Sequence, residues 1–152
     1  MAVGAVAVAA RSAERDTARA MSEENVETVR RFFDLLNRGA FDELDAITPA
    51  GFELDRSRSR SLENRVYRSD EIRGIWRDMG EAWADYDFFE TEMIDAGDIV
   101  VRVGGAHARG RSSGIEVQAD SATVWRFRDG TPVAAALFQT KAEALEAAGL
   151  SE

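Results

Sequence analysis

Residues 115–139 read IEVQADSATVWRFRDGTPVAAALFQ, and this stretch decides the fold. Up to Phe127 the side chains nearly alternate between two faces, and one face carries Val117, Ala119, Ser121, Thr123, Trp125 and Phe127. A period of two predicts a strand with one buried and one wetter face. Asp129-Gly130 is a strong signal for a tight hairpin turn. The stretch therefore predicts two long antiparallel strands in a curved sheet.

Composition limits the class of protein. A chain of 152 residues, 45% hydrophobic and 31% charged, suits one domain with a sizeable core. The net charge of −9 disfavours nucleic acid and anionic membranes as partners, because both select for basic patches. Cysteine is absent, which excludes disulfides, cysteine-bound metals and thiol nucleophiles and fits a cytoplasmic location. No apolar run in the sequence is long enough to span a membrane.

The first twenty residues differ from the rest of the chain. They are alanine-rich, then mixed in charge, and they contain no aromatic residue. Such a segment buries little, so we expect a disordered or fraying extension over residues 1–20, without a signal peptide, and a single domain over residues 21–152. Ser22 is the expected N-cap of the first helix, and Gly39 fits the position just after its end.

Further along the chain, helices come first and strands follow. The apolar spacing predicts helices over 41–47 and 69–83, the latter capped by Ser69, and a polar, arginine-rich loop over 57–64. A short strand over 51–56 precedes this loop. Four strands then follow over 86–95, 99–109, 115–127 and 131–139, and a closing helix over 141–148. This order indicates an α+β fold.

Several short motifs resemble a known family. They are MSEENVETVRRF at 21–32, NRG at 37–39, IDAGD at 94–98 and VWRFRDG at 124–130. Together they resemble a SnoaL-like protein of the nuclear transport factor 2-like superfamily. The resemblance implies a cone-shaped α+β barrel, in which a curved sheet wraps the N-terminal helices around an apolar pocket. It also implies homodimers formed through the sheet. Enzymes with this fold include polyketide cyclases, ketosteroid isomerases, dehydratases and epoxide hydrolases, and many other members have no known reaction.

His107 is the first candidate catalytic residue. It is the only histidine in the chain, and imidazole suits proton transfer near neutral pH. Within the strand expected over 99–109 it shares parity with Val101 and Val103, whereas Arg102 marks the other face. We therefore expect His107 on the concave side, near the rim. A rim histidine without a chemical task is the other interpretation, and one histidine without cysteines disfavours a metal site.

Asp55 is the second candidate. In ketosteroid isomerases, which the resemblance includes, the catalytic base is a carboxylate near the end of the corresponding strand. Here, alternation from Phe52 and Leu54 places Arg56 rather than Asp55 on the inward face, and arginine is no base at neutral pH. Asp55 reaches the pocket only if the strand bulges; a solvated carboxylate is the other interpretation.

A second set of residues is expected to bind the substrate. Thr123 stands where an isomerase carries a protonated acid, and its hydroxyl is a weaker donor. Arginines crowd the segment 56–68, which predicts either a solvated loop or a cationic gate for a carboxylate or phosphate. The full set of expected binding residues is Arg56, Tyr67, Trp76, Thr123, Trp125 and Phe33.

Three functions follow from these observations. The first is a pocket protein that binds a lipophilic small molecule, with or without an anionic group, and with or without cofactor-free isomerase- or cyclase-type acid–base chemistry on that molecule. The second is a non-enzymatic ligand-binding or dimeric interaction module. The third, a hydrolase or dehydratase, requires Asp55 and an arginine in the same cavity.

Overall fold

The computed structural model describes residues 3–58 and 65–151, with side chains from Arg11 onward. It contains four helices and six strands within these ranges, and the N-terminal helices precede most of the strands, as expected. In chain order they are α1 (Val3–Asn37), α2 (Phe41–Ile47), β1 (Glu53–Asp55), β2 (Val66–Arg68), α3 (Ser69–Ala82), β3 (Trp83–Ala96), β4 (Ile99–Gly110), β5 (Glu116–Arg128), β6 (Thr131–Phe138) and α4 (Lys141–Ala148).

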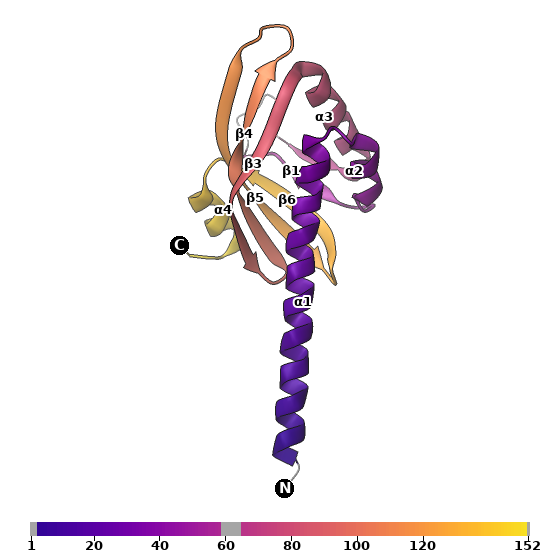
Figure 1. Cartoon of the computed structure of the whole chain (residues 1–152), viewed down its shortest axis with the longest axis vertical. Helices are drawn as coiled ribbons and strands as arrows, with labels where there is room; N and C mark the ends of the chain where they lie inside the picture. Colours follow the sequence, from indigo (N-terminus) through magenta and orange to yellow (C-terminus); the bar gives the residue numbers. More distant parts are fainter. Residues whose placement is uncertain (1–2, 59–64, 152) are drawn as a thin grey trace.

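The strands form one curved, mixed sheet in the order β2-β1-β6-β5-β4-β3 (Figure 1). Strands β3 to β6 form an antiparallel meander, whereas β1 runs parallel to β6. Asp129 and Gly130 both have positive φ angles, 50° and 79°, which suit a two-residue turn between β5 and β6. The predicted α+β fold and hairpin are therefore confirmed.

Helices cover the two faces of the sheet unequally. On the concave face, α1, α2 and α3 bury the larger core, which includes Phe32, Trp76 and Trp125. On the outer face, α4 packs with Val101 and Val124 in a smaller cluster. Helix α4 begins after Thr140, whose hydroxyl accepts a hydrogen bond from the Glu143 amide, and ends at Gly149 with a left-handed φ of 73°.

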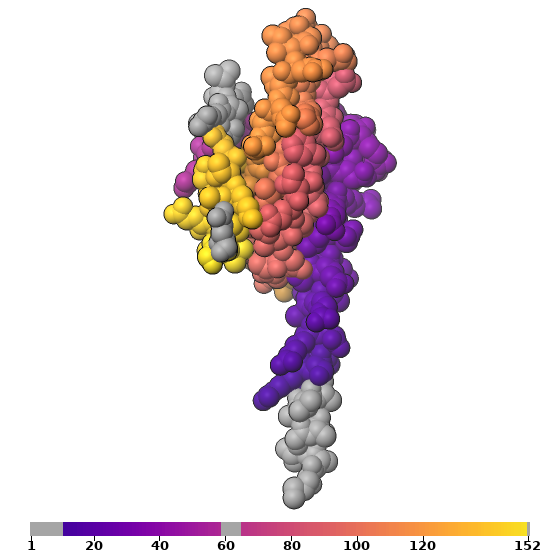
Figure 2. Space-filling view, turned by 60° about the vertical axis from the view of Figure 1, so that its left-hand side comes forward, coloured from indigo at the N-terminus to yellow at the C-terminus, as the bar shows by residue number. Residues whose placement is uncertain are grey.

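The first helix is longer than the sequence predicted. It reaches back to Val3, so Ser22 lies inside the helix rather than capping it, and its hydroxyl instead donates to Asp95. The indigo part of α1, which begins after residue 10, projects beyond the body of the molecule (Figure 2), and residues 11–20 are all exposed. Residues 11–20 are therefore exposed, as expected, but their backbone is helical. Alanine and arginine favour a helix even without packing. The domain boundary at residue 21 stays a prediction.

The region before α3 also differs in detail. The sequence did not predict β2, because Val66–Arg68 is too short for a period to be visible. Arg68 rather than Ser69 is the N-cap of α3. The Arg68 amide and the Arg65 guanidinium hold the pKa of Glu71 below its usual value. Arg60 and most of the predicted loop lie outside the described residues. Within the described part of the chain, none of the helices has the length and hydropathy needed to cross a membrane.

Candidate functional site

A cavity of about 680 Å³ lies between the helices and the concave face of the sheet. Such a volume falls within the usual range for small-molecule sites, roughly 300–1,000 Å³. Its lining is mostly apolar and comes from α1, β1, α3, β3, β5 and β6. The lining residues are Phe32, Phe33, Leu36, Leu54, Arg56, Ile75, Trp76, Asp78, Met79, Ala82, Trp83, Phe88, Thr123, Trp125, Ala135 and Leu137.

Aromatic rings form much of the wall. The Phe32 ring packs edge-to-face against Trp125 and Trp76, with centroids 4.9 and 5.7 Å apart. The Phe33 ring lies edge-to-face with Trp125, at 6.1 Å. These rings come from three distant stretches of the sequence, and each was placed on an apolar stripe by its helical or strand spacing. The expected binding residues Phe33, Trp76 and Trp125 therefore meet in one cavity.

Polar groups are few in this wall. Among the described residues that line it, only Arg56, Asp78 and Thr123 carry a hydroxyl or a formal charge. The buried Trp125 Nε1 donates to Thr123 Oγ1 over 2.9 Å. Because that oxygen already accepts, the Thr123 hydroxyl proton remains available for a ligand oxygen. Arg56 and Thr123 thus reach the cavity as predicted.

Asp55 does not reach it. The residue pairs with Ala136 of β6 on the outer side of the sheet, and its Oδ1 accepts bonds from the Ser57 amide (2.9 Å) and the Ser57 hydroxyl (2.5 Å). No bulge turns β1 inward here, so alternation holds, with Leu54 and Arg56 in the cavity wall. The hydrolase or dehydratase hypothesis required Asp55 in the same cavity as an arginine, and the structure contradicts that requirement.

Tyr67 also lies elsewhere than expected. It belongs to β2, where it pairs with Leu54, and it is buried in the core rather than in the cavity wall. The guanidinium carbons of Arg65 and Arg56 lie 3.9 and 5.9 Å from the centre of its ring. The phenol ring therefore makes cation–π contacts with two arginines of the segment before α3 and does not line the mouth of the cavity.

His107 lies on the opposite face of the sheet from the cavity. It is exposed and stands 4.9 Å from the Phe89 ring, centroid to centroid, beside an open hollow of about 350 Å³ that Asp87 and Glu116 also line. The predicted inward orientation was wrong because Val101 and Val103 are apolar for another reason: α4 covers the outer face there. The inward residue at this point of β4 is Arg102.

Arg102 is the main feature that the sequence analysis missed. Its side chain is buried, its Nη2 donates to the Phe88 carbonyl over 3.2 Å, and its guanidinium carbon lies 3.6 Å from the centre of the Phe33 ring. Burial lowers the pKa of Arg102, while the charge of Glu90 opposes this shift. The available signal in the sequence was an arginine inside the apolar run of residues 99–103. A charged side chain in such a run is either exposed to solvent or buried in a structural or binding role.

Asp78 was missed as well. It follows Ile75 by three positions on α3 and precedes Ala82 by four, and both neighbours line the cavity with it. This helical spacing was visible in the sequence. The side chain is largely exposed, which places its carboxylate at the rim. Across the described residues, no group of three histidine, cysteine or acidic side chains is placed to hold a metal ion.

Comparisons with known proteins support this arrangement. The model of the SnoaL-like domain family matches residues 29–134. A nuclear transport factor 2-like protein of unknown function from Burkholderia pseudomallei superposes with a TM-score of 0.66 at 20% identity, over 81% of this chain and 95% of that one. A SnoaL-like polyketide cyclase from Shewanella denitrificans, itself assigned only provisionally, gives 0.64 at 16% identity, over 81% and 97%.

One further structure bears on ligands. TerC, crystallised with polyporic acid, superposes with a TM-score of 0.65 at 14% identity, over 81% of this chain and 96% of that one. At these identities the similarity establishes the fold. No protein of curated function matches the sequence.

Proposed function

The chain belongs to the SnoaL-like domain family, and on this premise we propose that its cavity binds a lipophilic, ring-containing small molecule that carries an anionic or carbonyl oxygen. The observation that carries the proposal is an apolar cavity of about 680 Å³ with aromatic walls and very few polar side chains. Sites of this kind obtain affinity from apolar burial and orientation from a small number of polar groups. The polyketide cyclase and TerC with polyporic acid, both similar in fold, are consistent with it.

Arg56 and Thr123 are the groups that would orient the ligand. Arg56 extends the wall beyond Leu54, where its guanidinium can form charge-assisted bonds to a carboxylate or phenolate. Thr123 has a hydroxyl proton to donate, since its oxygen accepts from Trp125. Arg56 directly follows β1 and Thr123 belongs to β5, so a ligand that bridges them is held from two parts of the sheet.

Binding without chemical conversion is the function that the geometry supports best. Neither His107 nor Asp55 lines the cavity, and the lining carboxylate among the described residues is Asp78 at the rim. Acid–base catalysis is the second candidate, with Asp78 as its base. If it operates, Asp78→Asn abolishes turnover of a cognate substrate and leaves its binding intact. The expected homodimer through the sheet remains a proposal, which sedimentation equilibrium of the full chain tests.

A pair of fluorescent dyes tests the proposed binding. Phenylnaphthylamine and anilinonaphthalene sulfonate share one ring system, and only the second carries an anionic group. We expect both to bind the full chain, as followed by dye fluorescence and by quenching of tryptophan emission. Arg56→Met should weaken the sulfonate roughly tenfold, the effect of losing one charge-assisted bond, and leave the neutral dye unchanged.

The matched control is Arg128→Met, which removes the same charge from an exposed position at the end of β5. It should change the affinity of neither dye. Failure of both dyes to bind, or equal weakening of the sulfonate by Arg128→Met, would contradict the proposed site.

A further inference from the structure

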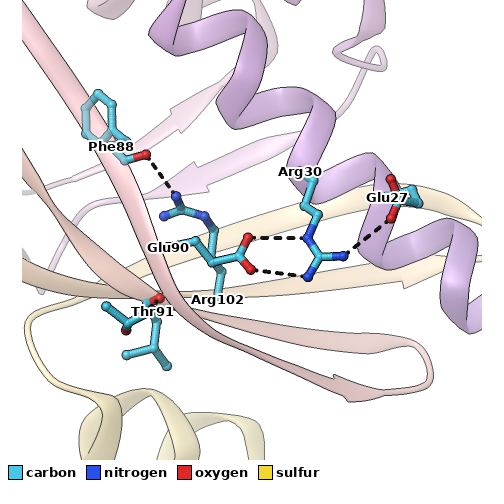
Figure 3. Close-up of polar contacts among 7 residues, drawn as sticks. Glu27, Arg30, Phe88, Glu90, Thr91 and Arg102 are labelled. Carbon is cyan, nitrogen blue, oxygen red and sulfur yellow. Dashed lines mark hydrogen bonds and ion pairs between the residues drawn. The ribbon is translucent and has the colours of Figure 1, made fainter.

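Arg102 is a buried charge without an ion-pair partner. Its side chain is 4% exposed, and among the described residues no carboxylate oxygen lies within 4 Å of its guanidinium. Glu90 on the neighbouring strand β3 turns its carboxylate to Arg30 on α1, with an Nη2–Oε2 distance of 3.2 Å (Figure 3). Arginines are rarely this buried unless they are paired, because the charge loses its hydration.

The contacts of Arg102 satisfy it only in part. Nη2 donates to the Phe88 carbonyl over 3.2 Å (Figure 3), and the Phe33 ring stacks on the guanidinium at 3.6 Å. Nε is buried and donates to no protein atom in the described part of the chain. A buried donor without an acceptor is destabilising, so folding alone does not account for an arginine at this position.

The guanidinium lies directly behind the cavity wall. Phe33, which stacks on it, and Phe88, whose carbonyl it binds, both line the cavity. Across the sheet Arg102 is the register partner of Thr123, another lining residue. Paired residues of neighbouring antiparallel strands face the same side, so Arg102 points toward the ligand space and is separated from it by the Phe33 ring.

We propose that Arg102 is a second anion-binding group of the same site, reached when the Phe33 ring turns aside, and that the preferred ligands are aromatic acids whose carboxylate enters first. This inference rests on the proposed function. It adds an orientation of the bound ligand to the proposed function. The acid group of the ligand lies at the sheet, beside Thr123, so Arg56 is not its only anion-binding partner. A forked guanidinium in a water-poor setting binds a carboxylate strongly, since both hydrogen bonds are charge-assisted.

The rival explanation is that Arg102 is a structural support that fixes Phe33 and the β3–β4 pair. The two explanations predict opposite effects on stability. If Arg102 serves binding, Arg102→Met removes an uncompensated buried charge at similar length, and the melting temperature of the full chain stays equal or rises. If it serves as a support, the melting temperature falls and both dyes lose affinity.

Dye binding completes the test. We expect Arg102→Met to weaken anilinonaphthalene sulfonate roughly tenfold to a hundredfold and to leave phenylnaphthylamine unchanged. Arg102→Lys keeps the charge but loses the fork, so its loss of sulfonate affinity should be smaller. The control is Arg109→Met on the same strand, whose half-exposed side chain pairs with Asp85 outside the cavity; it should change neither affinity.

The outcomes separate the two proposals. If the dyes bind the unmodified chain but Arg102→Met leaves their affinity ratio unchanged, the inference about Arg102 is overturned and the proposed function stands. A destabilised or unfolded Arg102→Met also overturns it, because the inference requires a stable variant. If neither dye binds the unmodified chain, both proposals fail.

Discussion

Val124 and Trp125 are neighbours on β5, yet they belong to two different kinds of layer. Val124 faces α4 in a cluster whose five buried members are at most 6% exposed. Trp125 faces the helices of the concave side, packs against the Phe32 and Phe33 rings of α1, and lines a cavity of about 680 Å³. Aliphatic side chains and the single ring of Phe138 fill the outer layer, whereas several large rings on the concave side meet at their edges and enclose space. One strand thus contributes to two layers. The outer, solid layer is filled by side chains and stabilises the fold, whereas the concave, hollow layer encloses a cavity that is able to bind a ligand.

The largest expected effect tests the solid layer. Phe138 is the largest side chain of the outer cluster, so Phe138→Ala should lower the free energy of unfolding by about 3–5 kcal/mol, measured by urea denaturation. Trp76→Ala on the concave side should cost less, toward the lower end at about 3 kcal/mol, because the Trp76 ring already borders empty space. Equal losses in the two variants would remove the distinction between the layers.

Two equally buried alanines sharpen the comparison. Ala122 and Ala135 are each 1% exposed, but Ala122 lies in the outer cluster and Ala135 lines the cavity. Ala122→Leu should destabilise the protein by about 1–3 kcal/mol through overpacking. Ala135→Leu should leave stability equal or higher, since the added carbons enter the cavity, and it should reduce the affinity of both dyes. A loss of stability in Ala135→Leu comparable to that in Ala122→Leu would show that the cavity is not available to the leucine.

The smallest expected effect concerns the rim of the concave layer. The Tyr86 hydroxyl donates to the Leu36 carbonyl at the end of α1 over 2.9 Å, and burial raises the pKa of Tyr86 above 10.0. The folded state therefore holds this proton more tightly than the unfolded chain. The resulting stabilisation is complete below pH 10 and is lost as the pH rises toward the folded-state pKa.

Tyr86→Phe should accordingly lower stability by about 0.5–1.5 kcal/mol at neutral pH, the net value of one hydrogen bond. It should also make the melting temperature fall less steeply between pH 9 and pH 11 than it does for the unmodified chain. Parallel pH profiles for the two proteins would show that Tyr86 does not contribute to this decline.

Local rules were enough for most of the fold. Alternation along β5 placed Thr123, Trp125 and Phe127 on one face, and the Asp129-Gly130 turn followed from its backbone requirements. Alternation from Phe52 and Leu54 likewise placed Arg56 inward and Asp55 outward, so the part of the cavity wall that this segment contributes was predictable from its local pattern.

The errors come from long-range packing that no local pattern contains. In β4, the alternation of Val101 and Val103 with Arg102 predicts that the valines face the concave core and that the arginine faces solvent. This prediction is correct only if helices cover the concave face of the sheet and leave the other face exposed. Because α4 covers the outer face, the valines are buried outside and Arg102 inside, which moves His107 away from the cavity. The position of α4 depends on the C-terminal residues, far from β4 in sequence.

The parallel pairing of β1 with β6 has a consequence for how the protein is made. More than half of the chain lies between Leu54 and its partner Ala135, so the β1–β6 contact closes a long loop and carries a large entropic cost. Helices α1 to α3 emerge from the ribosome well before β6, with the rings of Phe32, Phe33 and Trp76 still without their sheet. The cavity wall at Arg56 is therefore among the last parts to assemble, and the apolar surface that later becomes the ligand site is the surface most in need of protection from aggregation during synthesis.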